Sequence, residues 1–219
     1  MTNCTLCAEL RAQTGAAPWN RPLIETTNFV VIPSLGALIE GWVLVVPKEH
    51  HISMGALPEQ LRAEADELEL RTRTLLSDRY GSPIVAFEHG PSASQHGTGC
   101  GVDHAHLHLL PLACDLSRYV TPFVPHSLKW HPCNWVERTE AHKSGLDYLY
   151  LKPDGARGLI AVSEDFGSQV FRRAIADYLG AADQFSWREF PQFEIVGQTI
   201  EILTKVLLVR MGGRTEHAA

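Results

Sequence analysis

The sequence lacks any long hydrophobic run. Its longest apolar stretches, such as residues 42–46 and 206–209, are far shorter than the roughly 20 apolar residues that a membrane-spanning helix needs. The first residues show no charged segment followed by an apolar one, which is the pattern of a secretory signal. We therefore expect a cytoplasmic protein that does not bind a membrane.

Positive charge is not in excess either. The chain has 19 Lys and Arg residues against 25 Asp and Glu residues, which gives a formal net charge of −6 at pH 7. Broad binding to nucleic acid requires a basic face, so we expect no nucleic-acid partner. A small anionic substrate is compatible with this charge, because a few local dipoles and imidazoles are enough to bind one.

Cysteine is scarce and odd in number, the five being Cys4, Cys7, Cys100, Cys114 and Cys133. In a reducing compartment such cysteines are typical of metal ligands or free thiols, and not of a disulfide framework. Cys4 and Cys7 form a Cys-x2-Cys knuckle, whose spacing lets two thiolates reach one tetrahedral zinc ion. A redox pair or two free thiols have the same spacing. Because no second knuckle is present, histidines would have to complete a zinc site.

The remaining composition is that of an ordinary globular protein, with 45% hydrophobic and 20% charged residues among 219. This length allows one large domain or one domain with an extension, and no internal repeat is visible. Leucines at helical spacing predict a long helix over residues 58–80. Branched and apolar residues predict strands at residues 28–33, 38–47, 83–88 and 102–111.

The pattern changes after Pro111. Residues 115–145 show weak periodicity, and residues 147–151 and 158–162 then predict two strands joined by a turn. A helix is expected over residues 168–179, and a final helix or strand over about 196–209. We therefore divide the chain into residues 1–114 and a C-terminal α/β extension, residues 115–219, that packs on the first part or continues its core.

Three histidines alternate with apolar residues in the predicted strand 102–111. His104, His106 and His108 would share one face of that strand, since side chains two residues apart point the same way. A neutral imidazole nitrogen is a good nucleophile toward phosphorus, and neighbouring rings can donate hydrogen bonds to phosphate oxygens. The triplet therefore indicates an enzyme acting on a phosphate-linked substrate, with a metal-binding triplet as the alternative.

Residues 104–110 have the pattern His-φ-His-φ-His-φ-φ, where φ is apolar. Residues 42–50 end in Pro-Lys-x-His, and residues 87–91 with residues 99–103 form a Gly-rich, polar segment ahead of the triplet. On these motifs the chain resembles the HIT (histidine triad) superfamily over about residues 4–112. The longer chain, with its C-terminal tail, is similar to an extended bacterial HIT type.

The resemblance implies an α+β fold, with an antiparallel sheet of about five strands backed by the long helix, assembled as a homodimer. It implies that His106 attacks the α-phosphorus of a nucleotide and forms a nucleotidyl-histidine intermediate. His108 would bind phosphate oxygens or the leaving group, and the backbone carbonyl of His104 would fix the tautomer of His106. The implied activity is hydrolysis of a phosphoanhydride or phosphoramidate. The alternatives are a nucleotidyltransferase or phosphorylase, and a nucleotide-binding protein with weak catalysis.

The resemblance also implies a structural zinc site. Zinc-bearing relatives pair such a knuckle with the histidine of Pro-Lys-x-His and the first histidine of the triad. Carried over to this sequence, the ligands are Cys4, Cys7, His50 and His104, with His51 as the alternative to His50.

The substrate-binding residues implied by the resemblance are Asn28, Glu88, His89, Gly99, Cys100 and Gly101. Cys100 and Gly101 stand where many relatives have Gln and then Ser or Thr. Glu88 stands where relatives often have Asn or Gln, so its carboxylate could accept ribose hydroxyls but would repel a nearby phosphate.

Outside the motifs, Arg172 and Arg173 would suit a phosphate clamp, although a solvent-facing position on a helix is the simpler interpretation. Trp130, Trp135 and Trp187 could stack a base, but packing explains most tryptophans.

Overall fold

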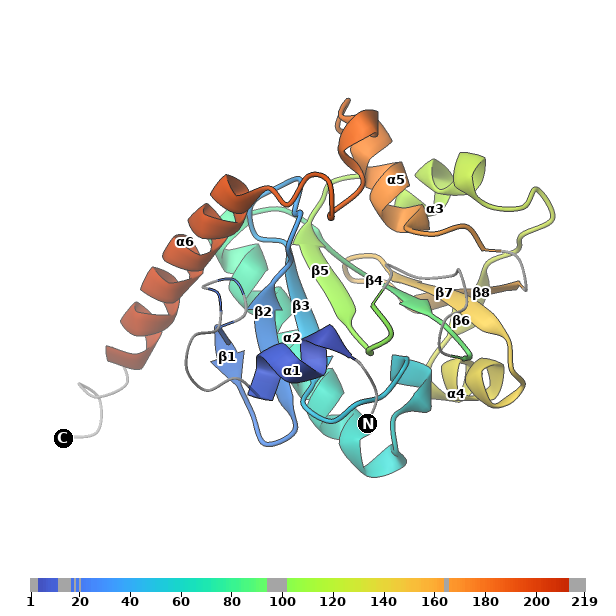
Figure 1. The fold of residues 1–219 in the computed structure, drawn as a ribbon, viewed down its shortest axis with the longest axis horizontal. Coiled ribbons are helices and arrows are strands. Elements are labelled where there is room, and N and C mark those ends of the chain that lie inside the picture. The colour runs from blue at the N-terminus through green and yellow to red at the C-terminus, as the bar shows by residue number, and fades with distance from the viewer. Residues whose placement is uncertain are drawn as a thin grey trace.

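An eight-stranded antiparallel sheet forms the centre of the protein (Figure 1). The computed structural model describes residues 4–11, 17, 19, 21–93, 102–163 and 166–212. The strand order is β1-β2-β3-β5-β4-β7-β8-β6. The strands are β1 Ile24–Glu25, β2 Phe29–Pro33, β3 Val43–Pro47, β4 Ile84–Gly90, β5 Leu107–Pro111, β6 His131–Cys133, β7 Asp147–Lys152 and β8 Gly158–Ser163.

The α+β architecture confirms the predicted fold class, but the prediction of about five strands was too low. The difference arises because β6, β7 and β8, which lie in the predicted extension, pair into the same sheet. β4 pairs with β7 from Ala86 opposite Lys152 to Gly90 opposite Tyr148. The sheet is therefore continuous across residue 114, and the boundary at that residue stays a prediction.

Helices cover both faces of the sheet. They are α1 Thr5–Arg11, α2 Glu59–Tyr80, α3 Leu116–Tyr119, α4 Trp135–Lys143, α5 Val170–Tyr178 and α6 Phe193–Gly212, with short 3-10 turns η2 Met54–Ala56, η3 Thr121–Phe123 and η4 Ala182–Gln184. The long helix predicted over residues 58–80 is confirmed by α2. The C-terminal segment is a helix and not a strand. Among the helices of the described residues, none combines the length and the apolar character needed to cross a membrane.

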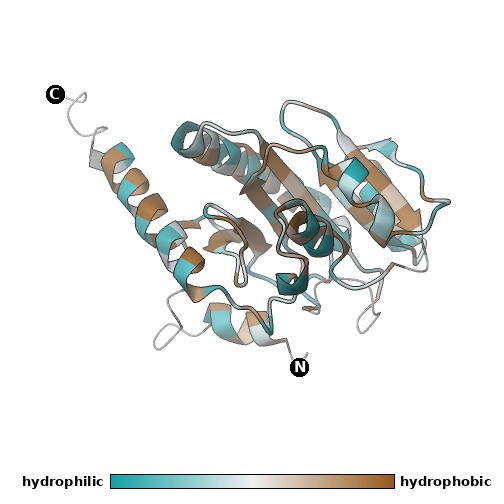
Figure 2. Ribbon diagram, turned by 90° about the horizontal axis from the view of Figure 1, so that it is seen from above, coloured by the Kyte–Doolittle hydropathy of each residue, from teal (hydrophilic) through white to brown (hydrophobic). Residues whose placement is uncertain are grey.

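The two faces of the sheet bury separate cores because side chains alternate along each strand. Val43, Val45, Leu107 and Leu109 pack beneath α2 in the first core. Phe87, Leu110 and Leu149 belong to the second core, which α3 and α5 cover. Leu6 of α1 packs on the second face of β2 and β3 in a small third cluster. Figure 2 shows brown hydrophobic residues along the strands, while the helices carry both teal hydrophilic and brown hydrophobic residues.

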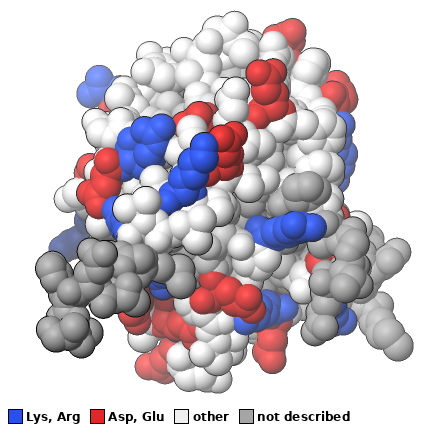
Figure 3. All heavy atoms as spheres, turned by 90° about the vertical axis from the view of Figure 1, so that its left-hand side faces the viewer, with Lys and Arg blue, Asp and Glu red and all other residues white. Residues whose placement is uncertain are grey.

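Charged side chains of both signs are interspersed on the face drawn in Figure 3, and neither sign dominates it.

A buried ion pair ties α2 to the sheet. The carboxylate of Glu69 lies 2.8 Å from Arg73 Nε and 2.8 Å from Lys152 Nζ, and its side chain is only 4% exposed. Arg73 also donates hydrogen bonds to the carbonyls of Ile84 and Lys152, in β4 and β7. Burial alone would raise the pKa of Glu69, but the two cations outweigh it and lower that pKa.

We expect Glu69→Gln to lower the free energy of unfolding by about 3 kcal/mol, because it leaves the buried Arg73 cation without its carboxylate. Urea unfolding followed by circular dichroism measures this loss. Glu67→Gln, on the exposed side of the same helix, should change stability by less than about 0.5 kcal/mol. If the two variants are equally stable, the ion pair does not anchor α2.

Candidate active site and metal centre

The histidine triplet lies at the start of β5. The strand begins at Leu107, so the prediction of a strand from residue 102 was wrong for His104 and His106, which precede it. The backbone N–H of Ala105 donates to the carbonyl of His51 at 2.6 Å, and not to a neighbouring strand. The alternation holds nevertheless, because Ala105 and Leu107 enter the core beneath α2.

His106 is held in one tautomer. Its Nδ1 lies 2.6 Å from the backbone carbonyl oxygen of His104, and a carbonyl only accepts hydrogen bonds. Nδ1 therefore carries the proton, and Nε2 keeps a free electron pair. Burial lowers the pKa of His106, although the carbonyl opposes this shift. A neutral ring with an unprotonated Nε2 is the form that a nucleophile at phosphorus requires.

His108 lies in β5 beside His106, with its ring centroid 4.9 Å away. Its Nδ1 accepts a hydrogen bond from the indole Nε1 of Trp42 at 2.9 Å. The ring is stacked on Phe87 with a centroid distance of 4.3 Å and an interplanar angle of 14°. Burial lowers the pKa of His108 well below its usual value, and repulsion from His106, His89 and Arg172 lowers it further.

Trp42 is a site residue that the sequence analysis missed. β3 and β5 are antiparallel, with Leu44 opposite His108. Trp42 directly precedes β3, and the same alternation brings its indole to the face of the sheet that carries His108. The sequence does show a tryptophan two residues before Leu44. Its proximity to His108 could be recognised only once the register between β3 and β5 was known.

His106 and His108 open into a pocket between β2, β3, α1 and the segment that contains α5. Its walls are mainly apolar or aromatic, with Leu6, Trp19, Ile32, Leu35, Leu44, Val102 and Trp187. Ser34, Glu9 and Arg172 add polar groups to the lining. Of the tryptophans considered from the sequence, Trp187 lines this pocket, while Trp135 donates through Nε1 to Asp66 at 2.8 Å and Trp130 packs near Phe171.

Arg172 is 1% exposed, so the solvent-facing position favoured from the sequence was wrong for this residue. Its Nε donates to the carbonyl of Phe185 at 2.9 Å, and a terminal nitrogen donates to the carbonyl of Gly36. The guanidinium lies 4.9 Å from the centroid of the Trp42 ring. Arg173 is exposed on the other side of α5. Arg172 thus joins the C-terminal segment to the wall of the histidine pocket.

His89 lies on the same face of the sheet as His106 and His108 but is 4% exposed. Its Nε2 accepts a hydrogen bond of 3.3 Å from the backbone N–H of Phe171, at the start of α5. Burial lowers the pKa of His89 to about 3, with contributions from His106 and Arg172. His89 is a neutral packing and hydrogen-bonding residue between β4 and α5, and its role in binding substrate stays a prediction.

Two predicted substrate-binding residues lie away from this pocket. The oxygens of Glu88 accept hydrogen bonds from the backbone N–H of Met54 at 2.5 Å and from the hydroxyl of Tyr148 at 2.7 Å. Glu88 alternates with Phe87, so it points to the opposite face of the sheet from His108. The Asn28 side chain donates to Glu64 of α2 at 2.6 Å. We therefore leave Glu88 and Asn28 out of the proposed substrate site.

The remaining predicted loop residues, Gly99, Cys100 and Gly101, lie outside the described residues.

Cys4, Cys7, His50 and His104 come together although they are far apart in sequence, and one ligand atom from each lies within 4.8 Å of all the others. Cys7 Sγ lies 3.4 Å from His50 Nδ1 and 3.3 Å from His104 Nδ1, and Cys4 Sγ lies 3.5 Å from His104 Nδ1. Thiolate and imidazole ligands of one tetrahedral zinc ion are about 3.5 Å apart when the bonds are about 2.3 and 2.0 Å long. The donor set and its spacing fit zinc.

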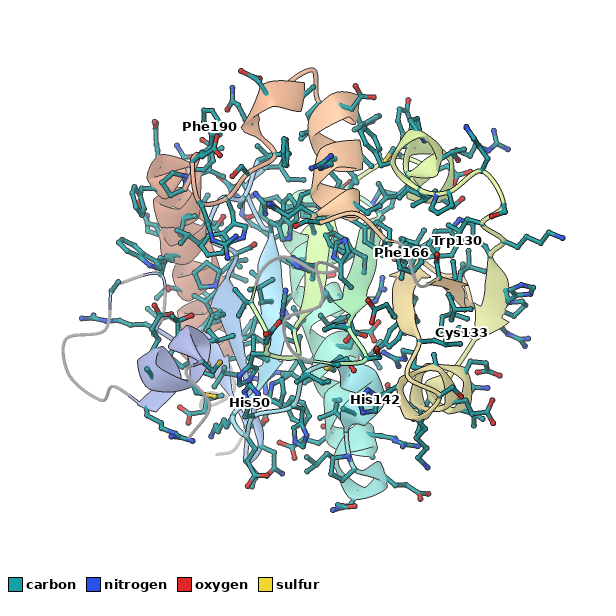
Figure 4. All side chains as sticks on the ribbon, turned by 45° about the vertical axis from the view of Figure 1, so that its right-hand side comes forward. His50, Trp130, Cys133, His142, Phe166 and Phe190 are labelled. Carbon is teal, nitrogen blue, oxygen red and sulfur yellow. The ribbon has the colours of Figure 1, made fainter. Side chains whose placement is uncertain are left out.

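The opposite ring nitrogen of His104 completes this geometry. His104 Nε2 lies 2.8 Å from the carbonyl oxygen of Pro47, so Nε2 carries the proton and Nδ1 is available to a metal. Figure 4 shows His50 beside α1, the helix that carries Cys7. Of the two histidines left open by the sequence, His50 is the one whose side chain joins the cluster.

No protein-family model matches the chain, and no curated protein matches it. Solved structures are similar over part of its length. A Zn-bound histidine triad family protein from Mycobacterium smegmatis is 23% identical, covering 52% of this chain and 77% of its own, with a TM-score of 0.40. A hypothetical histidine triad nucleotide-binding protein from Sulfolobus tokodaii is 22% identical, covering 49% and 68%, with a TM-score of 0.39.

Yeast Ap4A phosphorylase in complex with AMP is 12% identical, covering 64% of this chain and 57% of its own, with a TM-score of 0.36. At these levels of similarity, the roles of individual residues follow only from the geometry of this chain.

His89 predicts a pH dependence of stability. Its folded pKa of about 3 lies below the usual value near 6.5, so the unfolded chain binds the extra proton. The stabilisation is therefore present above pH 6.5 and is lost as the pH falls toward 3. When the pH falls from 7 to 5, the free energy of unfolding of the wild type should decrease. The decrease in His89→Gln should be about 2 kcal/mol smaller.

Urea unfolding at the two pH values measures the difference. His131→Gln removes an exposed histidine and should lose as much stability as the wild type. An equal loss in His89→Gln and the wild type would contradict the assignment of His89 as a buried neutral residue.

Proposed function

We propose that this chain is a histidine triad enzyme that cleaves a nucleotide at its α-phosphorus through a nucleotidyl-histidine intermediate. The observation that carries the proposal is the fixed tautomer of His106, whose Nδ1 lies 2.6 Å from the His104 carbonyl oxygen. This hydrogen bond leaves Nε2 unprotonated beside a pocket lined by both His106 and His108. His106 therefore combines an unprotonated nitrogen with a position in the pocket lining, as attack on phosphorus requires.

The first step forms a bond between His106 Nε2 and the α-phosphorus and breaks the bond between that phosphorus and the leaving group. The modified ring carries a positive charge, which the His104 carbonyl stabilises through Nδ1–H. His108 donates a hydrogen bond to a phosphate oxygen or to the leaving group. Water then forms a bond to the same phosphorus and loses a proton to the solvent. The bond between phosphorus and His106 Nε2 breaks, Nε2 recovers its electron pair, and the nucleoside monophosphate is released. Phosphate or another acceptor in place of water would make the enzyme a phosphorylase or transferase.

The apolar pocket supports a nucleoside as the part of the substrate that is retained. Flat bases bind well between aliphatic and aromatic side chains, and Trp19 and Trp187 line this pocket. Ser34 adds a hydroxyl to the same wall. The predicted homodimer and cytoplasmic location stay predictions beside this proposal.

We also propose that Cys4, Cys7, His50 and His104 hold a structural zinc ion. Four protein ligands close the coordination shell, so the ion would leave no position for substrate. The ion would join α1 to the segment ahead of β5. Because Thr5 and Leu6 of α1 line the pocket, this link also shapes the substrate site.

His106→Asn should lower turnover of diadenosine tetraphosphate at least roughly a thousandfold, because the attacking nitrogen is removed. Chromatography of released AMP measures turnover, and mass spectrometry after brief mixing detects the nucleotidyl adduct on His106. His126→Asn, which changes an exposed histidine, should retain wild-type turnover. Undiminished turnover by His106→Asn, or no turnover of any nucleotide by the wild type, would rule out the proposed activity.

The zinc proposal predicts about one zinc ion per chain in the purified protein, measured by elemental mass spectrometry. Cys7→Ser should lose nearly all of this zinc, because a serine hydroxyl is a poor substitute for a thiolate ligand. Cys114→Ser alters a cysteine outside the cluster and should keep it. Zinc retained by Cys7→Ser, or absent from the wild type, would show that the cluster is not a zinc site.

A further inference from the structure

We propose that Trp42 is a positioning residue that keeps His108 neutral with its proton on Nε2, and that it thereby restricts the enzyme to nucleotides whose leaving group departs as a stable anion. The substrate class is then a phosphoanhydride and not a phosphoramidate. This inference rests on the proposed attack of His106 on an α-phosphorus and decides between the two bond types that the proposed function allows.

The hydrogen bond between Trp42 and His108 has only one possible direction. An indole nitrogen donates and cannot accept, so the bond of 2.9 Å from Trp42 Nε1 requires an unprotonated Nδ1 on His108. Neutral His108 must then carry its proton on Nε2. If the ring were doubly protonated, its Nδ1–H would point at the indole N–H. The hydrogen bond would then be lost, and two donors would face each other.

The packing allows neither ring to turn away. Trp42 is 0% exposed and His108 is 3% exposed, and Phe87 is stacked on His108 at 4.3 Å. Trp42 also lies edge-on to the same imidazole, with ring centroids 5.7 Å apart. The donor and the acceptor are therefore fixed together in the second core of the protein.

The surrounding charges also oppose a positively charged His108. The Arg172 guanidinium of α5 lies 4.9 Å from the Trp42 ring and lines the same pocket as His108. Among the described residues, the groups whose charge lowers the pKa of His108 are His106 ahead of β5, His89 of β4 and Arg172 of α5. Arg172 is a permanent cation and repels an added proton, while His89 and His106 would repel it only when they are themselves protonated.

This arrangement suits one kind of leaving group. When His106 Nε2 bonds to the α-phosphorus of an anhydride, the P–O bond breaks and the bridging oxygen takes the electron pair as part of a phosphate. Such a phosphate ionises near pH 6 and leaves without a proton. The Nε2–H of His108 can donate a hydrogen bond to that oxygen without giving up its proton.

A P–N bond places a different demand on the site. The leaving nitrogen would depart as a strongly basic amide anion unless an acid protonates it during bond cleavage. Neutral His108 cannot supply that proton, because its loss would leave an imidazolate.

The test compares diadenosine tetraphosphate with adenosine 5′-phosphoramidate, since both deliver AMP to the same histidine. For the wild type we expect a kcat/KM ratio of roughly a thousand or more in favour of the anhydride. Trp42→Phe keeps an aromatic ring but removes the N–H, so it should reduce this ratio at least tenfold. Trp42→His, which offers a group that can accept a proton, should reduce it further.

Trp135→Phe is the matched control, because it also loses an indole hydrogen bond, the one to Asp66, at the surface of α4. It should keep the wild-type ratio. A wild-type ratio within threefold of unity, or an unchanged ratio in Trp42→Phe, overturns the inference and leaves the proposed function standing. Turnover of neither substrate by the wild type overturns the proposed function and the substrate class together.

Nitrogen-15 NMR of the histidine side chains tests the role of Trp42 without turnover, and its wild-type measurement needs no variant. In the wild type, His108 should show an unprotonated Nδ1 and a protonated Nε2 from pH 5 to pH 8. In Trp42→Phe the two signals should shift toward an average of both tautomers or titrate within this range. A protonated Nδ1 on His108 in the wild type would overturn the inference whatever the kinetics.

Discussion

The hydrogen bond between His106 Nδ1 and the backbone carbonyl of His104 is the interaction on which the site depends. It assigns the proton of His106 to one nitrogen and leaves the other to react. The same residue, His104, contributes its side chain to the cluster with Cys4, Cys7 and His50. One residue thus connects the candidate metal centre to the candidate nucleophile, and its two functions use different atoms.

Each of the three histidines of the triplet has a hydrogen bond that determines which of its ring nitrogens carries the proton. His104 Nε2 meets the carbonyl of Pro47, His106 Nδ1 meets the carbonyl of His104, and His108 Nδ1 meets the indole of Trp42. Two of these partners, the carbonyls, accept a hydrogen bond, and the third, the indole, donates one. The rings consequently present different nitrogens to their surroundings, which explains how three chemically identical side chains can have three different roles.

Local sequence patterns predicted the elements whose signal lies within a few residues. The leucine spacing of α2, the apolar run of β3 and the Cys-x2-Cys knuckle are of this kind, and the four predicted metal-binding residues do come together. The strand count was too low because sheet membership depends on pairing between distant segments, as between β4 and β7. Glu88 was predicted to bind substrate from its position in the motif. A motif gives the position of a residue along the chain but does not show toward which face of the sheet its side chain points.

The tertiary contacts of Trp42 and Arg172 explain why sequence alone could not assign them. Trp42 reaches His108 only through the register of β3 with β5. Arg172 looks like a surface charge on a helix until Gly36 and Phe185 are seen to accept its hydrogen bonds. Both residues contact the face of the sheet that carries His106 and His108, where the first and second halves of the chain meet.

The stereochemical course at the α-phosphorus is the most direct test of covalent catalysis by His106. An α-thio-substituted nucleotide anhydride of known configuration, hydrolysed in water enriched in oxygen-18, gives a product whose configuration reports the number of displacements. Two in-line displacements, one by His106 and one by water, predict retention. Inversion would mean that water attacks the phosphorus directly, and it would contradict the nucleotidyl-histidine intermediate.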